Sequence, residues 1–407
     1  MTFGRPQPWQ NPRLHRRLIM TDSAATRAPL RIAVDCSLLS GNNGGLGRYL
    51  RALLPRMMAR TNGTVHWHLY ARSGAACAQL PAAARLRQDH LPEHIGRILS
   101  PVLTLPYWLS RDRPDAFWAP AHRLPLWLPP TTAGVVTIHD LAWHRVPETL
   151  RRSTRLLDRA LMGRSVARAE RIIAVSHSTA TDVAAHWPDT QARTRVIHGA
   201  AEALPSPSRL SDCSPELQPQ HYFLFVGTPE PRKNLPRLLE AYALACRTQT
   251  NLPPLAIAGG HGWGGEDLKA QISRLQLTER VYLLGPVTEA ALATLYANAL
   301  CLVMPSLYEG FGLPIVEALQ HRLPVVTSNN SSMPEVAGAA GLLVDPLAPN
   351  SIAEALLRIA QHQPLRKTLA DAAGAQASRF CWDRAAEATL AVLLEAAADK
   401  RSTSPVN

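Results

Sequence analysis

The chain has 407 residues, of which 46% are apolar. It is long enough for two ordinary domains with buried cores, which excludes disordered and fibrous proteins. The six cysteines are scattered, with no Cys-x-x-Cys pair and no histidine at metal-ligand spacing, so we expect a reducing compartment and no structural zinc. No apolar run reaches the roughly 18 residues of a membrane-spanning helix, and the N-terminus lacks the apolar core of a signal peptide. We therefore expect the protein to stay on the cytoplasmic side.

The positive charge is concentrated in the first half of the chain. Residues 1–215 carry 28 arginines, no lysine and 14 acidic residues, a net charge of +14, whereas residues 216–407 carry 15 basic and 17 acidic residues, or −2. Such a half could attract a nucleic acid, an anionic membrane or a phosphorylated substrate, or it could reflect compositional bias alone.

The N-terminal half reads as a tail followed by an α/β domain. Residues 1–28 are polar, rich in Arg and Pro and without periodicity, which predicts a disordered tail. Short apolar runs then alternate with helical periods, which predicts a parallel sheet. The expected strands cover residues 31–36, 65–70, 134–138 and 171–175. We place this domain at residues 29–204.

A Pro/Ser-rich stretch at residues 205–220 has the composition of a linker, and a second alternation follows it. The expected strands of this second domain, residues 221–380, cover residues 222–226, 255–258, 280–284, 300–304, 324–327 and 341–344. The predicted fold class is therefore α/β, with two Rossmann-like domains facing across a cleft. Ligands of such sheets bind at the carboxyl ends of the strands.

Three motifs follow expected strands. The first, Gly-Asn-Asn-Gly-Gly-Leu-Gly at residues 41–47, precedes an amphipathic helix and suits either close backbone approach to a ligand or a plain tight turn. The second, Gly-Thr-Pro-Glu-Pro-Arg-Lys-Asn at residues 227–234, places Arg232 and Lys233 ahead of a helix with Asn234 as its expected N-cap. The two cations form a pocket suited to a diphosphate, unless they are simply solvated.

The third motif, at residues 306–317, contains two carboxylates separated by seven residues. Pro314 fits a first helical turn, so Glu309 should lie in the preceding loop and Glu317 one turn into the helix. Gly310 and Gly312 between them leave backbone donors free. Carboxylates accept hydrogen bonds from vicinal hydroxyls and glycine N–H groups suit phosphate, although helix capping is an alternative role for both glutamates.

Together with Ala-Gly-Gly-His-Gly-Trp at residues 258–263 and Ile-His-Asp at residues 138–140, these motifs resemble the retaining group 1 glycosyltransferases of family 4. The resemblance runs from about residue 31 to residue 400, and is strongest to the bacterial mannosyltransferase-like branch that builds surface polysaccharide. It implies the GT-B arrangement of an N-terminal acceptor domain and a C-terminal donor-nucleotide domain. It also implies a final helix at residues 381–401 that returns to the N-terminal domain.

The resemblance implies metal-independent hexosyl transfer, with GDP-mannose favoured as donor, no other cofactor, and a lipid-linked or polysaccharide acceptor. Arg232 and Lys233 would neutralise the leaving diphosphate, and Glu309 would contact the sugar. One departure is Thr228, which stands where many relatives carry arginine. The implied catalytic set is His139, Arg232, Lys233 and Glu309. The implied donor-binding set is Gly45, Gly47, Gly227, Gly310, Phe311, Gly312, Leu313 and Glu317.

Other readings stay open at this stage. A nucleotide-sugar epimerase also uses Rossmann domains, and His139 could be a structural histidine. An Arg-rich first half could belong to a non-catalytic membrane or nucleic-acid binder, although its tryptophans fall in no RNA-binding signature, so we expect no nucleic acid. A peripheral membrane contact is suggested by a predicted helix on which basic residues lie beside apolar ones. The basic residues are Arg151, Arg152, Arg155 and Arg159, and the apolar ones are Leu156, Leu157, Leu161 and Met162.

Overall fold

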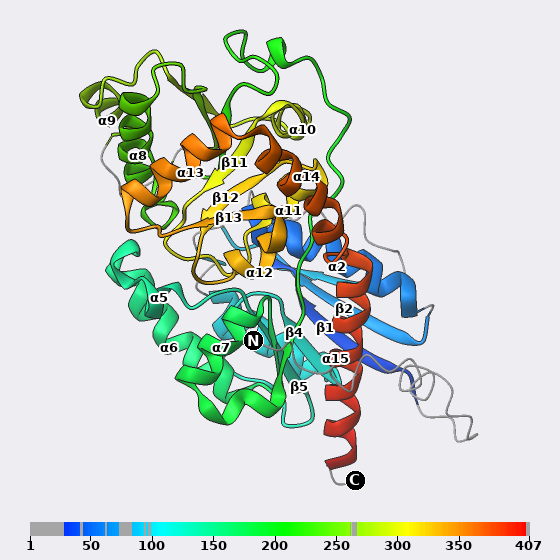
Figure 1. Ribbon diagram of the computed structural model, residues 1–407. Coiled ribbons are helices and arrows are strands. Elements are labelled where there is room, and N and C mark those ends of the chain that lie inside the picture. The colour runs from blue at the N-terminus through cyan, green and yellow to red at the C-terminus, as the bar shows by residue number, and fades with distance from the viewer. Residues whose placement is uncertain are drawn as a thin grey trace.

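The computed structural model describes residues 28–40, 44–61, 63–72, 84–92, 95, 96, 99–260, 262 and 267–403. The expected tail at residues 1–28 therefore lies almost entirely outside the described residues. The chain forms two parallel sheets, each carrying helices, which confirms the predicted fold class (Figure 1).

The N-terminal sheet has the order β3-β2-β1-β4-β5-β6-β7. Its strands are β1 (Leu30–Asp35), β2 (Val65–Ala71), β3 (Arg85–Gln88), β4 (Ala116–Ala119), β5 (Ala133–Ile138), β6 (Arg171–Ala174) and β7 (Thr194–Val196). The C-terminal sheet has the order β10-β9-β8-β11-β12-β13. Its strands are β8 (Phe223–Val226), β9 (Leu255–Ala258), β10 (Val281–Gly285), β11 (Cys301–Met304), β12 (Val325–Ser328) and β13 (Gly341–Val344).

Helices connect the strands and cover the sheets. Those of the N-terminal half are α2 (Gly44–Thr61), α4 (Leu105–Asp112), α5 (Ala142–Arg145), α6 (Arg152–Arg168) and α7 (His177–His186). Those of the C-terminal half are α8 (Leu235–Thr248), α9 (Leu268–Arg274), α10 (Glu289–Asn298), α11 (Leu313–Gln320), α12 (Met333–Ala337), α13 (Pro349–Gln361) and α14 (Gln363–Ala377). A last helix, α15, spans Trp382–Thr403.

Both sheets reverse their strand order beside their first strand, which is where parallel α/β sheets bind ligands. In the C-terminal sheet the reversal lies between β8 and β11, and both strands are almost entirely buried because apolar side chains fill both faces. The loops that follow these two strands carry the second and third sequence motifs. The topology therefore brings the two motifs together.

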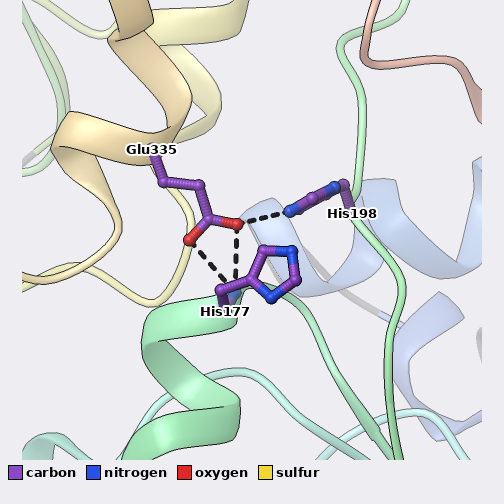
Figure 2. A group of neighbouring side chains, drawn as sticks. All are labelled: His177, His198 and Glu335. Atoms are coloured by element: carbon purple, nitrogen blue, oxygen red, sulfur yellow. Dashed lines mark hydrogen bonds and ion pairs between the residues drawn. The ribbon is translucent and has the colours of Figure 1, made fainter. Parts of the chain in front are cut away.

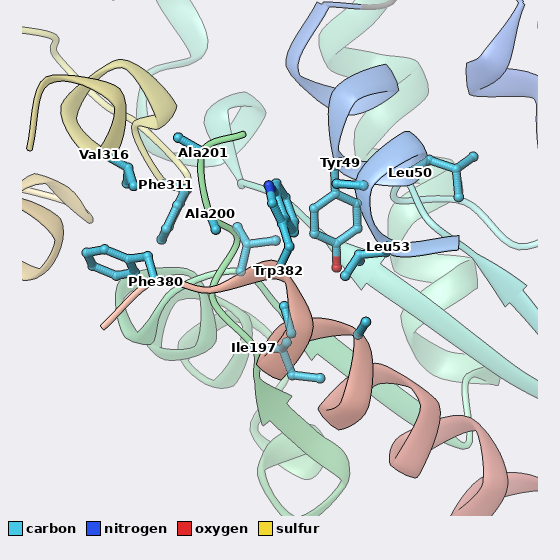
Figure 3. Packing of buried hydrophobic residues seen from close by; sticks show 14 of the residues in the cluster. Tyr49, Leu50, Leu53, Ile197, Ala200, Ala201, Phe311, Val316, Phe380 and Trp382 are labelled. Carbon is cyan, nitrogen blue, oxygen red and sulfur yellow. The ribbon is translucent and has the colours of Figure 1, made fainter. Parts of the chain in front are cut away.

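The two halves share one apolar core cluster. Figure 3 shows Tyr49 and Leu53 of α2 beside Trp382 of α15, with Phe311 of the C-terminal half and Phe380 close to Ala200. The Tyr49 and Trp382 ring centroids lie 5.8 Å apart. Burial of such aromatic rings stabilises contact between the halves.

Helix α15 packs on the N-terminal sheet although it follows the C-terminal half. It contacts α2, β4, β5 and β6 (Figure 1). Ion pairs tie its last turns to that sheet: Lys400 to Glu170 at 2.6 Å and Arg401 to Asp115 at 2.7 Å.

The Pro/Ser-rich connection between the halves is packed against the C-terminal half. Leu210 and Leu217 are buried, and the Ser208 backbone N–H donates to Thr294 Oγ1 at 2.7 Å.

Candidate functional site

The centre of the site is a carboxylate held by two cations. Arg232 and Lys233 lie in a short helical turn after β8, and Glu309 lies in the loop after β11. Arg232 Nη1 is 2.6 Å from Glu309 Oε2, and Lys233 Nζ is 2.7 Å from Glu309 Oε1. All three side chains are less than a fifth exposed. The sequence analysis predicted the cationic pocket but did not anticipate that Glu309 pairs with both cations.

These contacts determine the charges of the cluster. Burial alone would raise the pKa of Glu309, but the charges of Arg232 and Lys233 outweigh it and lower the pKa to about 2. Burial would lower the pKa of Arg232, yet Glu309 raises it above its usual value. A second carboxylate, that of Glu230, lies 3.5 Å from Arg232 Nη2, so two cations face two carboxylates. The cluster therefore offers an anionic ligand its N–H donors and not a net positive charge.

Asn234 occupies the N-cap position directly before α8, as predicted, but its side chain does not cap the helix. The residue has a left-handed backbone (φ 62°), and its amide donates to the carbonyls of Pro305 and Pro346 at 2.9 and 2.8 Å. The predicted capping bond is thus wrong. The amide instead fixes the loop after β8 to the loops after β11 and β13.

Glu317 lies in α11, which begins at Leu313 after Gly312 and has Pro314 in its first turn, as predicted. Gly312 has a φ of 100°, which favours glycine. Glu317 Oε2 accepts a hydrogen bond from Tyr296 Oη at 2.8 Å, and Oε1 is 2.9 Å from Arg48 Nη1 of the N-terminal half. Burial raises the pKa of Glu317 despite Arg48.

His139 follows β5 and points into the protein. Its Nε2 lies 2.7 Å from the Pro120 carbonyl, which can only accept, so Nε2 carries the proton and Nδ1 is left with its lone pair. Burial and the neighbouring His122 lower the pKa of His139 to about 4. The imidazole is therefore neutral near pH 7. Its ring also contacts Tyr49 edge-on, at 4.9 Å between centroids.

The two halves meet at Gly310. A Cβ atom on Gly310 would lie 1.8 Å from the His139 carbonyl oxygen, so only glycine fits. Thr179 Oγ1, in α7, lies 3.2 Å from the His139 carbonyl and 3.3 Å from the Gly310 carbonyl and can donate to either. His139 is therefore brought next to the loop that carries Glu309.

The remaining predicted glycines have different surroundings. A Cβ on Gly45 would be 3.4 Å from Leu313 Cδ1, so this glycine faces the start of α11. Gly47 is buried against the Leu38 carbonyl of its own segment. Gly227 has a φ of 151°, and its carbonyl would be 2.0 Å from a Cβ on Gly259. Gly259 belongs to the motif at residues 258–263, of which His261 and Trp263 lie outside the described residues.

A cavity of about 740 Å³ adjoins these loops at the ends of β8, β9 and β10. Its walls include Glu230, Gly259 and Gly285, but Glu309 and Glu317 do not line it. Residues of α8 and α9 and, from the N-terminal half, Glu148 and Thr149 also line it.

A second contact between the halves involves two histidines and a glutamate that sequence reasoning missed (Figure 2). Glu335 of α12 accepts from the His177 backbone N–H at 3.0 Å, and its Oε1 is 2.5 Å from His198 Nε2. Burial would raise the pKa of Glu335, but hydrogen bonds from His198 and from the His177 backbone lower it. Within the part of the chain that the structure describes, these three side chains form the one group whose ligand atoms lie close enough together to bind a metal ion. Hydrogen bonds to His198 and to the His177 backbone already occupy the Glu335 carboxylate.

The predicted basic stripe lies at the start of α6, with Arg151 directly before its first residue. Arg151, Arg152, Arg155 and Arg159 are exposed, and Leu156 and Leu157 are 66% and 48% exposed. Met162 faces the core, where its sulfur accepts from Trp143 Nε1, so the apolar stripe does not run the full length predicted. No helix in the described residues is both long and apolar enough to span a membrane.

Comparison with known proteins identifies the family. Residues 213–376 match the family model described as glycosyl transferases group 1, and residues 43–202 match glycosyltransferase family 4. The O-antigen chain mannosyltransferase B of Escherichia coli is 31% identical over 85% of this chain and 94% of its own length.

Solved structures share the fold. A sucrose-phosphate synthase from Thermosynechococcus elongatus has a TM-score of 0.69 at 20% identity, covering 91% of this chain and all of that one. HepE from Anabaena in complex with UDP-glucose has a TM-score of 0.63 at 20% identity, covering 92% of this chain and all of that one. These comparisons confirm the predicted family and not the alternatives of an epimerase or a non-catalytic binder. The chain belongs to the group 1 glycosyltransferases and is a GT-B glycosyltransferase.

Proposed function

We propose that the enzyme is a retaining mannosyltransferase that moves mannose from GDP-mannose to a growing surface polysaccharide or lipid-linked glycan. The observation that carries the proposal is the cluster of Arg232, Lys233 and Glu309, at the point where the C-terminal sheet reverses its strand order. The loop that carries Glu309 approaches the neutral His139 closely at Gly310. The name of the Escherichia coli relative supports the choice of sugar and product.

The cluster suits departure of a diphosphate. As the bond between the sugar and phosphate breaks, negative charge grows on the diphosphate and the sugar becomes positively charged. An ammonium has three N–H donors and Glu309 is within hydrogen-bonding distance of Lys233, so further donors of Lys233 are available to phosphate. Preorganised cations of this kind lower the barrier without a divalent ion.

Retention would follow from attack on the same face of the sugar that the diphosphate leaves. The acceptor hydroxyl forms the new bond to the anomeric carbon, the old bond to phosphate oxygen breaks, and the hydroxyl proton passes to the departing phosphate. Neutral His139 is suited to hydrogen-bond the sugar through Nδ1, but not to act as the acid.

The test of this function is a panel of nucleotide sugars, each assayed for hydrolysis and for transfer to a lipid-linked glycan. We expect GDP-mannose to be used in preference to UDP-glucose, with the anomeric configuration retained by NMR of the product. Preference for another nucleotide sugar would refute the assigned donor, and an inverted product would refute the mechanism.

A peripheral membrane contact through α6 is the second part of the proposal. The exposed Leu156 and Leu157 beside the four arginines support it, because a core-packed helix would bury those leucines. Each basic residue contributes about 1 kcal/mol near an anionic surface. Replacing the four arginines with Gln should release the protein from vesicles of anionic phosphatidylglycerol and leave donor hydrolysis unchanged. Vesicles of phosphatidylcholine are the control, and equal binding to both would exclude this contact.

A further inference from the structure

Arg48 joins the two halves at the glutamate of the donor site. It lies in the first turns of α2, directly after the Gly45 to Gly47 segment, and its Nη1 is 2.9 Å from Glu317 Oε1. The Arg48 side chain is 42% exposed, whereas that of Glu317 is 6% exposed. A partly solvated cation of the N-terminal half thus reaches a buried carboxylate of the C-terminal half.

The two oxygens of Glu317 have different partners. Oε2 accepts from Tyr296, which is 1% exposed and held in the C-terminal core. That bond is fixed because the tyrosine ring has no room to move. Oε1 faces Arg48, whose flexible side chain can leave. Oε1 is therefore the oxygen that a ligand can take.

A guanidinium offers a carboxylate two parallel N–H donors, much as a ribose offers two neighbouring hydroxyls. If the ribose of the donor binds Glu317, it must displace Arg48 from Oε1. The freed guanidinium then needs a new acceptor. Gly45, on the same helix, lies near the end of the loop where the proposed function places the diphosphate, because a Cβ on it would be 3.4 Å from Leu313 Cδ1.

We propose that Arg48 changes partner when the donor binds, from Glu317 Oε1 to the donor diphosphate. This inference rests on the proposed function. Arg48 is then a donor-binding residue supplied by the N-terminal half. It also supplies the cation that Thr228 does not provide.

The test compares the affinity of GDP with that of guanosine by titration calorimetry, in wild type and in Arg48→Gln. Loss of Arg48 removes a phosphate contact and also a competitor for Glu317. We expect GDP to bind about tenfold more weakly, as for loss of one charge-assisted contact, and guanosine to bind equally or more tightly. Arg56→Gln removes the same charge two turns further along α2, where the arginine pairs with Glu202, and should change neither affinity.

Arg48→Lys keeps the charge and should retain most of the GDP affinity. Equal changes for GDP and guanosine in Arg48→Gln, in either direction, would overturn the proposal while leaving the proposed function intact. Failure of the wild type to bind GDP would overturn both.

Discussion

Replacing Gly310 with alanine should separate the two halves at the reaction centre. The added Cβ would lie 1.8 Å from the His139 carbonyl oxygen, whereas a carbon–oxygen contact needs about 3.3 Å. The two loops must therefore move apart by about 1.5 Å. Such a shift also breaks the bridge that Thr179 makes to both carbonyls. A misplacement of about 1 Å can lower the rate about a hundredfold.

We therefore expect kcat/KM for transfer to fall at least about a hundredfold in Gly310→Ala, which corresponds to about 2.7 kcal/mol of transition-state stabilisation. Steady-state assay of transfer would measure this, with circular dichroism to show that both sheets remain folded. Gly374→Ala is the matched control, because its Cβ meets nothing nearer than 3.9 Å within helix α14. Activity of Gly310→Ala within about threefold of wild type would show that the close approach is not needed for catalysis.

Three further predictions concern Lys233, divalent metal ions and Glu335. Lys233→Ala should lower turnover about a hundredfold, whereas Lys367→Ala on the surface should not, and near-normal turnover in the first would remove Lys233 from the site. Activity should survive EDTA, because Arg232 and Lys233 are proposed to stabilise the leaving diphosphate. A loss of activity that manganese restores would contradict catalysis by these two side chains alone. The lowered pKa of Glu335 stabilises the fold above pH 4.5, and this contribution disappears as the pH falls through the folded pKa. The difference in unfolding free energy between wild type and Glu335→Gln should therefore shrink below pH 4.5, and a constant difference would contradict the pairing.

The buried strands were predictable because they read as continuous apolar runs. Strand β5 is buried throughout, and its predicted residues 134–138 match the observed strand to within one residue. Three strands were missed. β3 is a polar edge strand with the sequence Arg-Leu-Arg-Gln and β7 has only three residues, so neither has a detectable period. β4, Ala-Phe-Trp-Ala, is a buried apolar run as long as the predicted β8 and β11, so its signal was present and was overlooked.

The site was predictable where its residues lie close in sequence and not where distant segments meet. Glu309 and Glu317 belong to one motif, but Arg48 pairs with Glu317 across 269 positions. Glu335 and His198 are likewise separated by 137 positions. A local sequence pattern cannot predict contacts between residues so far apart in the chain. For Arg48 a weak signal existed, since a cation directly follows the glycine cluster at a helix start.

The return of α15 to the first sheet has a consequence for synthesis of the chain. Ala386, Leu390 and Leu393 fill the core against β4 to β6, yet they emerge from the ribosome about 190 residues after β7. Domains usually fold from the N-terminus during synthesis. Here one apolar face of the first sheet stays exposed until α15 has been synthesised. Chains cut before Trp382 should consequently be bound by chaperones and degraded, even though every residue of the charged cluster is already present.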